Sequence, residues 1–80
     1  MNLFGHKNKI DADSQIMLTE EGKREADTYV SQAPPYRILS ALHERSPRNV
    51  RDISTEANMD VEEAKEWIKK LEKQGYTRVN

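Results

Sequence analysis

The chain has 80 residues, of which 35% are hydrophobic and 6% aromatic, and it contains no cysteine. A chain of this length makes one domain with a small core, and the lack of cysteine excludes disulfide bonds and thiolate metal sites. Its 13 basic and 14 acidic residues give a net charge of −1, so the strongly basic balance that favours nucleic-acid binding is absent.

Residues 1–13 are predicted to form a flexible leader in front of a single domain at residues 14–80. The leader is polar after Phe4 and shows no hydrophobic periodicity. It holds no apolar stretch long enough for a signal peptide or a membrane span. We therefore expect a cytoplasmic protein without a membrane anchor, which the lack of cysteine also suits.

Ser14–Leu18 is a short apolar run that predicts a strand leading into the first helix. Thr19 can cap that helix, and the two glutamates after it lie near the positive end of the helix dipole. The helix is expected to run to about Val30. Its inward face would hold Ala26, Tyr29 and Val30.

Gln32–Pro35 separates this helix from a second one, which is predicted to run from Tyr36 to about Arg45. Proline cannot continue a helix from its interior, but it suits the first turn of the next helix. Ser46-Pro47 ends the second helix. Its buried face would hold Ile38, Leu39 and Leu42.

Asn49 is expected to start a third, short helix, with Asp52 in a capping relation to it. The buried positions of this helix would be Val50, Ile53 and Ala57. Asn58 follows, and asparagine tolerates the left-handed conformation that a tight turn between two helices needs.

Asp60 caps the fourth predicted helix, with Glu63 as its capping-box partner, and Gly75 ends it in a left-handed conformation. Apolar residues recur along it at the spacing of one helix face, at Val61, Ala64, Ile68 and Leu71. Tyr76–Val79 alternates in polarity and predicts a final strand. The predicted fold is mainly α with a small β-sheet, in the order strand, four helices, strand.

The third and fourth helices carry a recognisable pattern between Asn49 and Tyr76. An acidic, an aliphatic and a small residue precede the turn, and the long helix closes on Leu-Glu-x-x-Gly and a hydrophobic residue. The matching positions are Asp52, Ile53, Ser54, Asn58, Met59, Asp60, Leu71, Glu72, Gly75 and Tyr76. This half of the chain resembles the winged helix-turn-helix superfamily. The resemblance implies a small transcriptional regulator, of bacterial, archaeal or phage type, that binds double-stranded DNA.

Leu18–Gly22 forms a second familiar element, Leu-Thr-x-x-Gly. In many winged-helix regulators this element follows the wing, whereas here it precedes the core. The chain also ends at Asn80, before the returning strand of an ordinary wing hairpin. We therefore expect Gln15–Leu18 to pair with Tyr76–Val79, since each of these short strands otherwise lacks a partner.

The resemblance implies that the fourth helix is a recognition helix, whose N-terminal half enters the major groove. Its expected outward positions are Glu62, Glu63, Lys65, Glu66 and Lys69, and glutamates repel phosphates. The implied nucleic-acid-binding residues are Arg48, Asn49, Arg51, Glu62, Lys65, Lys69 and Arg78. For each charged residue on its own, a solvated surface position is the alternative interpretation.

A protein-interaction or dimerisation module without DNA binding is the competing interpretation, because winged helices also serve as docking units. Trp67 would lie on a half-exposed flank of the fourth helix, where it could anchor a partner protein. Alternatively, Trp67 closes the core against Tyr29 or Tyr76. A homodimer fits both functions, but the sequence does not fix its surface.

The sequence predicts no enzyme, no metal site and no cofactor. His6 and His43 lie far apart and have no clustered carboxylates at metal-ligand spacing. The glycines are isolated, and no serine has a base positioned beside it. The adjacent glutamates at the starts of the first and fourth helices do not face each other, so they are better interpreted as partners of the helix dipoles.

Overall fold

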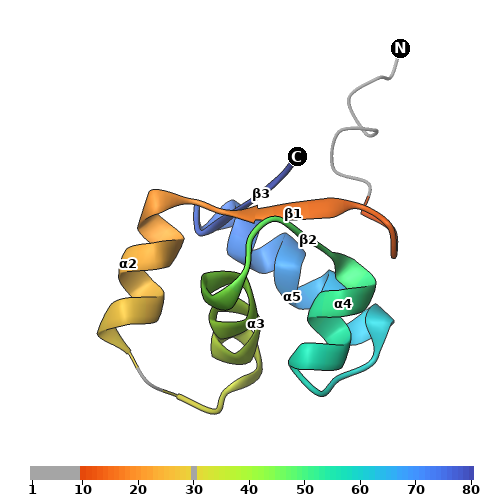
Figure 1. Ribbon diagram of the computed structural model, residues 1–80, viewed down its shortest axis with the longest axis horizontal. Helices are drawn as coiled ribbons and strands as arrows, with labels where there is room; N and C mark the ends of the chain where they lie inside the picture. The colour runs from red at the N-terminus through yellow and green to blue at the C-terminus, as the bar shows by residue number, and fades with distance from the viewer. Residues whose placement is uncertain (1–9, 30) are drawn as a thin grey trace.

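The computed structural model describes residues 10–29 and 31–80 (Figure 1). Within these ranges the chain forms strand β1 (Gln15–Leu18), helices α2 (Glu20–Thr28) and α3 (Pro34–Glu44), strand β2 (Arg48–Asn49), helices α4 (Val50–Glu56) and α5 (Val61–Lys73) and strand β3 (Thr77–Val79). The predicted mainly α fold with a small sheet is confirmed. None of the helices in this described part is long and apolar enough to cross a membrane.

The sheet joins the two ends of the domain. β1 pairs antiparallel with β3, and Ile16 lies opposite Val79 while Leu18 lies opposite Thr77. This confirms the predicted pairing of the N-terminal and C-terminal strands. On its other edge β1 pairs antiparallel with β2, so the strand order is β2-β1-β3. The sequence did not indicate β2, because two residues are too short to show alternation.

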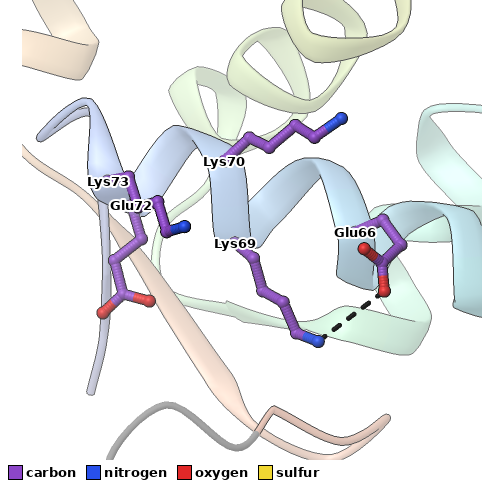
Figure 2. A pocket seen from close by; sticks show the side chains of 5 residues that line it. All are labelled: Glu66, Lys69, Lys70, Glu72 and Lys73. Atoms are coloured by element: carbon purple, nitrogen blue, oxygen red, sulfur yellow. Dashed lines mark ion pairs between the residues drawn. The ribbon is translucent and has the colours of Figure 1, made fainter.

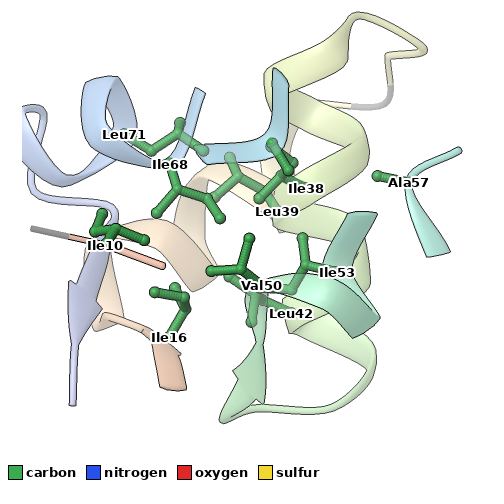
Figure 3. Close-up of a cluster of buried hydrophobic side chains, with 11 residues drawn as sticks. Ile10, Ile16, Ile38, Leu39, Leu42, Val50, Ile53, Ala57, Ile68 and Leu71 are labelled. Carbon is green, nitrogen blue, oxygen red and sulfur yellow. The ribbon is translucent and has the colours of Figure 1, made fainter. Parts of the chain in front are cut away.

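The helices form the core beneath this sheet, and most of the predicted apolar stripes are buried in it (Figure 3). The fully buried large side chains come from β1, α3, α4 and α5: Ile16, Ile38, Leu39, Leu42, Val50, Ile53 and Ile68. Ala57, Ala64 and Leu71 are also buried, whereas Val61 is only partly buried. The spacing of apolar residues therefore identified the inward faces of α3, α4 and α5 correctly.

The predicted helix caps are also present. The side chains of Thr19, Asn49 and Asp60 accept hydrogen bonds from backbone N–H groups of the helices that follow them, at 3.0, 2.8 and 2.8 Å. Asn58 has a φ of 58° and Gly75 a φ of 85°, the left-handed conformations expected at these two turns. Local sequence signals therefore set where α2, α4 and α5 begin and where α4 and α5 end.

The segment Ile10–Asp13, which we assigned to the leader, contacts the domain. Ile10 is only 5% exposed and belongs to the core. The backbone N–H of Arg51 donates to the carbonyl of Ala12 at 3.1 Å, which attaches the segment to the start of α4. The rest of the predicted leader, residues 1–9, lies outside the described residues.

The end of α2 differs from the prediction. The helix stops at Thr28, and Tyr29 adopts an extended conformation and is 55% exposed. The predicted inward position of Tyr29 is therefore wrong, because the helical register is lost one residue before it. Ala26 is partly buried and packs against the core, and Val30 lies outside the described residues. α3 begins at Pro34, ahead of the predicted Tyr36, because both prolines fit its first turn.

Leu-Thr-x-x-Gly and the end of α5, far apart in sequence, meet in the structure. The Thr19 hydroxyl donates to the carbonyl of Gly75 at 2.6 Å, and the Thr19 N–H donates to the carbonyl of Tyr76 at 3.1 Å. Gly22 is buried against the backbone of Tyr76 and the side chain of Leu18. This contact fixes the start of α2 on the turn between α5 and β3.

Candidate functional site

The outward face of α5 is exposed, as the helical spacing predicted. Glu62, Glu63, Glu66 and Lys69 are exposed, and Lys65 is partly buried. α5 contacts α3, α4 and β3.

Both lysines predicted to contact DNA on α5 have a carboxylate of the same helix beside them. Lys65 Nζ lies 3.1 Å from Glu62, and Lys69 Nζ lies 3.6 Å from Glu66 (Figure 2). Each pair joins positions three residues apart, which are neighbours on a helix surface. A phosphate that approached either lysine would also approach a carboxylate.

Arg51 is exposed at the start of α4, and it too is paired. Its Nη1 lies 2.8 Å from Asp13, and the side chains are 58% and 80% exposed, respectively. An exposed pair of this kind is weak and can open. The acidic partner nevertheless comes from the segment that is bound to the start of α4, so it stays close to the arginine.

Arg48 and Asn49 have structural roles. The Arg48 side chain is only 10% exposed, its Nη1 lies 3.7 Å from Glu56, and its Nε is buried without a hydrogen-bond partner. The Asn49 side chain caps α4. Arg78 is exposed on β3, where its Nη2 lies 3.9 Å from the sulfur of Met17.

Most of the charges on α5 are sorted along the helix. Its first half carries Glu62, Glu63 and Glu66 with one lysine, Lys65, and its second half carries Lys69, Lys70 and Lys73 with one glutamate, Glu72. The three lysines of the second half border a surface hollow together with Glu66 and Glu72 (Figure 2). This order of charges is visible in the sequence.

Trp67 lies at the middle of α5, partly buried and packed against the core. Its indole N–H donates to Glu63 at 3.4 Å, and Lys70 Nζ lies 4.9 Å from the ring centroid. These contacts place the ring between an acidic and a basic residue of its own helix. The packing of Trp67 against the core agrees with the interpretation that it closes the core, and its use as an anchor for a partner protein stays a prediction.

A second cluster gathers the tyrosines around Glu25. The Tyr36 hydroxyl donates to Glu25 at 2.6 Å, and the rings of Tyr29 and Tyr36 lie 6.1 Å apart. The hydrogen bond to Glu25, followed by burial, raises the pKa of Tyr36 to about 12. Burial, followed by the charge of Glu25, raises the pKa of Tyr76. The hydrogen bond from Tyr36 to Glu25 therefore links α2 to α3.

The raised pKa of Tyr36 predicts a loss of stability at high pH. The folded pKa of about 12 lies above the ordinary value of 10.0, so folding favours the protonated phenol. Its contribution is complete below pH 10 and is lost as the pH rises through 12. Phenolate absorbance should show that Tyr36 and Tyr76 titrate above the ordinary pKa of a tyrosine, and Glu25→Gln should lower the pKa of Tyr36. An unchanged titration in Glu25→Gln would exclude Glu25 as the cause.

The described residues contain no cluster suited to metal binding. His43 Nε2 lies 2.8 Å from Asp27, an exposed pair between α3 and α2. No group of three or more histidine, cysteine, aspartate or glutamate residues in this part of the chain could hold a metal ion. His6 lies outside the described residues. No protein-family model, curated protein or solved structure matches the chain, so its function is inferred from these contacts.

Proposed function

We propose that this chain is a winged-helix protein that binds another protein and does not bind DNA. The winged-helix assignment is supported by the turn between α4 and α5, where Asn58 has a positive φ, and by strand β3, which follows α5 and belongs to the sheet. In an ordinary wing, a returning strand pairs with the strand after the recognition helix. Here β1 takes that position beside β3.

The observation that carries the proposal is that four of the five predicted DNA-facing cations, Arg48 beside Glu56 among them, lie next to carboxylates of the same chain. Arg51, Lys65 and Lys69 are paired with Asp13, Glu62 and Glu66. DNA affinity comes largely from replacing counterions on phosphates with protein cations. Cations that already have acidic neighbours gain little from phosphates, and the neighbours repel the DNA.

The acidic half of α5 strengthens this argument. A recognition helix presents its N-terminal half to the groove, between two phosphate backbones. Here that half carries three exposed glutamates, at Glu62, Glu63 and Glu66. A glutamate can accept a hydrogen bond from a cytosine amino group, but three of them on one short face bring charge repulsion at every register.

A DNA-binding transcriptional regulator is the second candidate function. The helix-turn-helix arrangement of α4 and α5 favours it, together with the exposure of Arg51, Lys69 and Arg78. This support comes from the resemblance of the fold more than from the chemistry of the surface. The two candidates make opposite predictions for a single titration.

We expect no saturable binding when the protein is titrated into fluorescent mixed-sequence duplex DNA at about 50 mM salt, a condition that strengthens electrostatic binding. Fluorescence anisotropy measures this directly. Binding that weakens steeply as salt is raised, and that Arg51→Glu removes, would overturn the proposal in favour of the regulator. Arg51→Glu should leave a protein contact centred on Trp67 nearly unchanged.

A further inference from the structure

The exposed face of α5 has a charge order that is complementary to itself. Glu63 and Glu66 lie before the middle of the helix, and Lys70 and Lys73 lie after it. At about 100° per residue, these four side chains and Trp67 fall within about one third of the helix circumference. They form one stripe, which we call the α5 stripe. Its four charged side chains are exposed, and Trp67 lies at the edge of the stripe that adjoins the core.

A two-fold axis through the middle of this stripe would bring unlike charges together. If two copies of α5 run antiparallel, with the axis near Ile68, Glu63 of one copy lies opposite Lys73 of the other. Glu66 likewise lies opposite Lys70. Symmetry repeats both pairings, so every charge of the stripe faces its opposite. A parallel arrangement would instead place glutamates against glutamates.

Trp67 is placed to anchor such a contact. It is the central residue of Val61–Lys73, so the two copies of Trp67 would flank the axis. Large aromatic side chains near the centre of an interface supply much of its binding energy, while charged pairs around them set orientation and specificity. The hydrogen bond to Glu63 and the position of Lys70 over the ring hold the side chain in place within the stripe.

We propose that the partner of this face is a second copy of the chain, bound through antiparallel α5 helices. The inference rests on the proposed function, because a helix covered in this way cannot enter a DNA groove. A uniformly acidic partner would be repelled by the first half of the stripe, and a uniformly basic partner by the second half. A second copy matches both halves at once, which identifies it by charge complementarity.

Charge-reversal complementation tests the arrangement. The first variant carries Glu63→Lys and Glu66→Lys, and the second carries Lys70→Glu and Lys73→Glu. Sedimentation velocity over a concentration series should show wild-type dimers, whereas each variant alone should dissociate at least tenfold more readily because like charges then face each other. An equimolar mixture of the two variants should restore the dimer. Simple loss of helix stability would not be rescued by mixing.

Two further variants distinguish an effect of the α5 stripe on the dimer from a general effect of substitution. Trp67→Ala should weaken the dimer at least tenfold, since it removes the central anchor. Lys23→Glu, on the exposed side of α2, should leave the dimer unchanged. Circular dichroism establishes that each variant is folded. If the double reversals fail to fold, the single reversals Glu66→Lys and Lys70→Glu provide the same mixing test with less change to the helix.

The outcomes distinguish the two proposals. A wild-type chain that stays monomeric up to about 1 mM, the weak end of specific affinities, overturns the dimer. A dimer that neither double reversal nor Trp67→Ala weakens places the interface elsewhere and also overturns it. A monomer that binds no DNA removes only the dimer and leaves a different protein as the partner. Salt-dependent DNA binding removes the proposed function itself.

Discussion

Gly22→Ala is expected to destabilise the folded protein by about 2–3 kcal/mol, a large effect for the addition of one methyl group. A Cβ at this position would overlap the carbonyl oxygen of Tyr76 and lie 2.6 Å from Leu18 Cδ1. The carbonyl belongs to the backbone and accepts the hydrogen bond from Thr19, so it cannot move without breaking the contact between α2 and the turn after α5. The clash outweighs the roughly 1 kcal/mol by which alanine favours a helix over glycine.

Thermal unfolding measures this effect, and the expected drop in Tm is about 10–20 °C for a domain of this size. Gly75→Ala is the matched control. Gly75 has a φ of 85° but nothing within 4 Å of an added Cβ, so its substitution costs only the left-handed penalty of about 1 kcal/mol. A Gly22→Ala protein as stable as the wild type would show that α2 is not packed against Tyr76.

Ile16→Ala should cost about 3–4 kcal/mol, because it removes a fully buried side chain and leaves a cavity. Ile16 lies on β1, the central strand, which pairs with β2 on one edge and with β3 on the other. The loss therefore falls where the sheet meets α3, and it weakens both ends of the domain together. Urea unfolding, followed by circular dichroism, gives the free energy of unfolding directly.

Gln15→Ala provides the comparison on the same strand. Gln15 is exposed next to Ile16, and a surface substitution of this kind usually changes stability by less than about 0.5 kcal/mol. Equal, small effects of the two substitutions would mean that β1 is peripheral to the domain. A large difference would establish that the N-terminal strand completes the core.

Capping residues and left-handed turn residues were sufficient to predict where α4 and α5 begin and end. The start of each helix after Asn49 depends on a capping side chain, at Asn49 and Asp60, and both caps are made within a few residues of the chain. The ends of α4 and α5 depend on the left-handed conformations of Asn58 and Gly75. These interactions join residues only a few positions apart, so the same residue pattern accompanies them in any fold. The helix ends can therefore be predicted from the sequence alone.

The elements that were missed depend on distant parts of the chain. β2 consists of only Arg48 and Asn49, and it is a strand because β1 lies beside it. Ile10 is buried because it packs into the hydrophobic core, although its neighbours in the sequence are polar. Tyr29 had the spacing of an inward residue but lies just after the end of α2. Helical periodicity cannot predict the burial of a residue that lies beyond the end of the helix.

On the candidate surface, too, the contacts between residues close in sequence were predictable and the contacts between distant residues were not. The spacing of Lys65 from Glu62 and of Lys69 from Glu66 could be recognised in the sequence as neighbouring positions on a helix. The pairing of Arg51 with Asp13 could not, since 38 residues separate them. The internal role of Arg48 was also hidden, because its burial follows from the packing of β2 beside α4.

The sequence by itself determined the side-chain caps of α2, α4 and α5, the inward faces of α3, α4 and α5 and the order of charges along α5, since each depends on residues within a turn or two of one another. Only the tertiary structure decided how the pieces meet. Leu-Thr-x-x-Gly and the Gly75–Tyr76 turn are separate patterns in the sequence, yet Thr19 and Gly22 contact that turn directly. Such contacts join residues far apart in the chain, and they exist only once the core has brought both ends of the domain together.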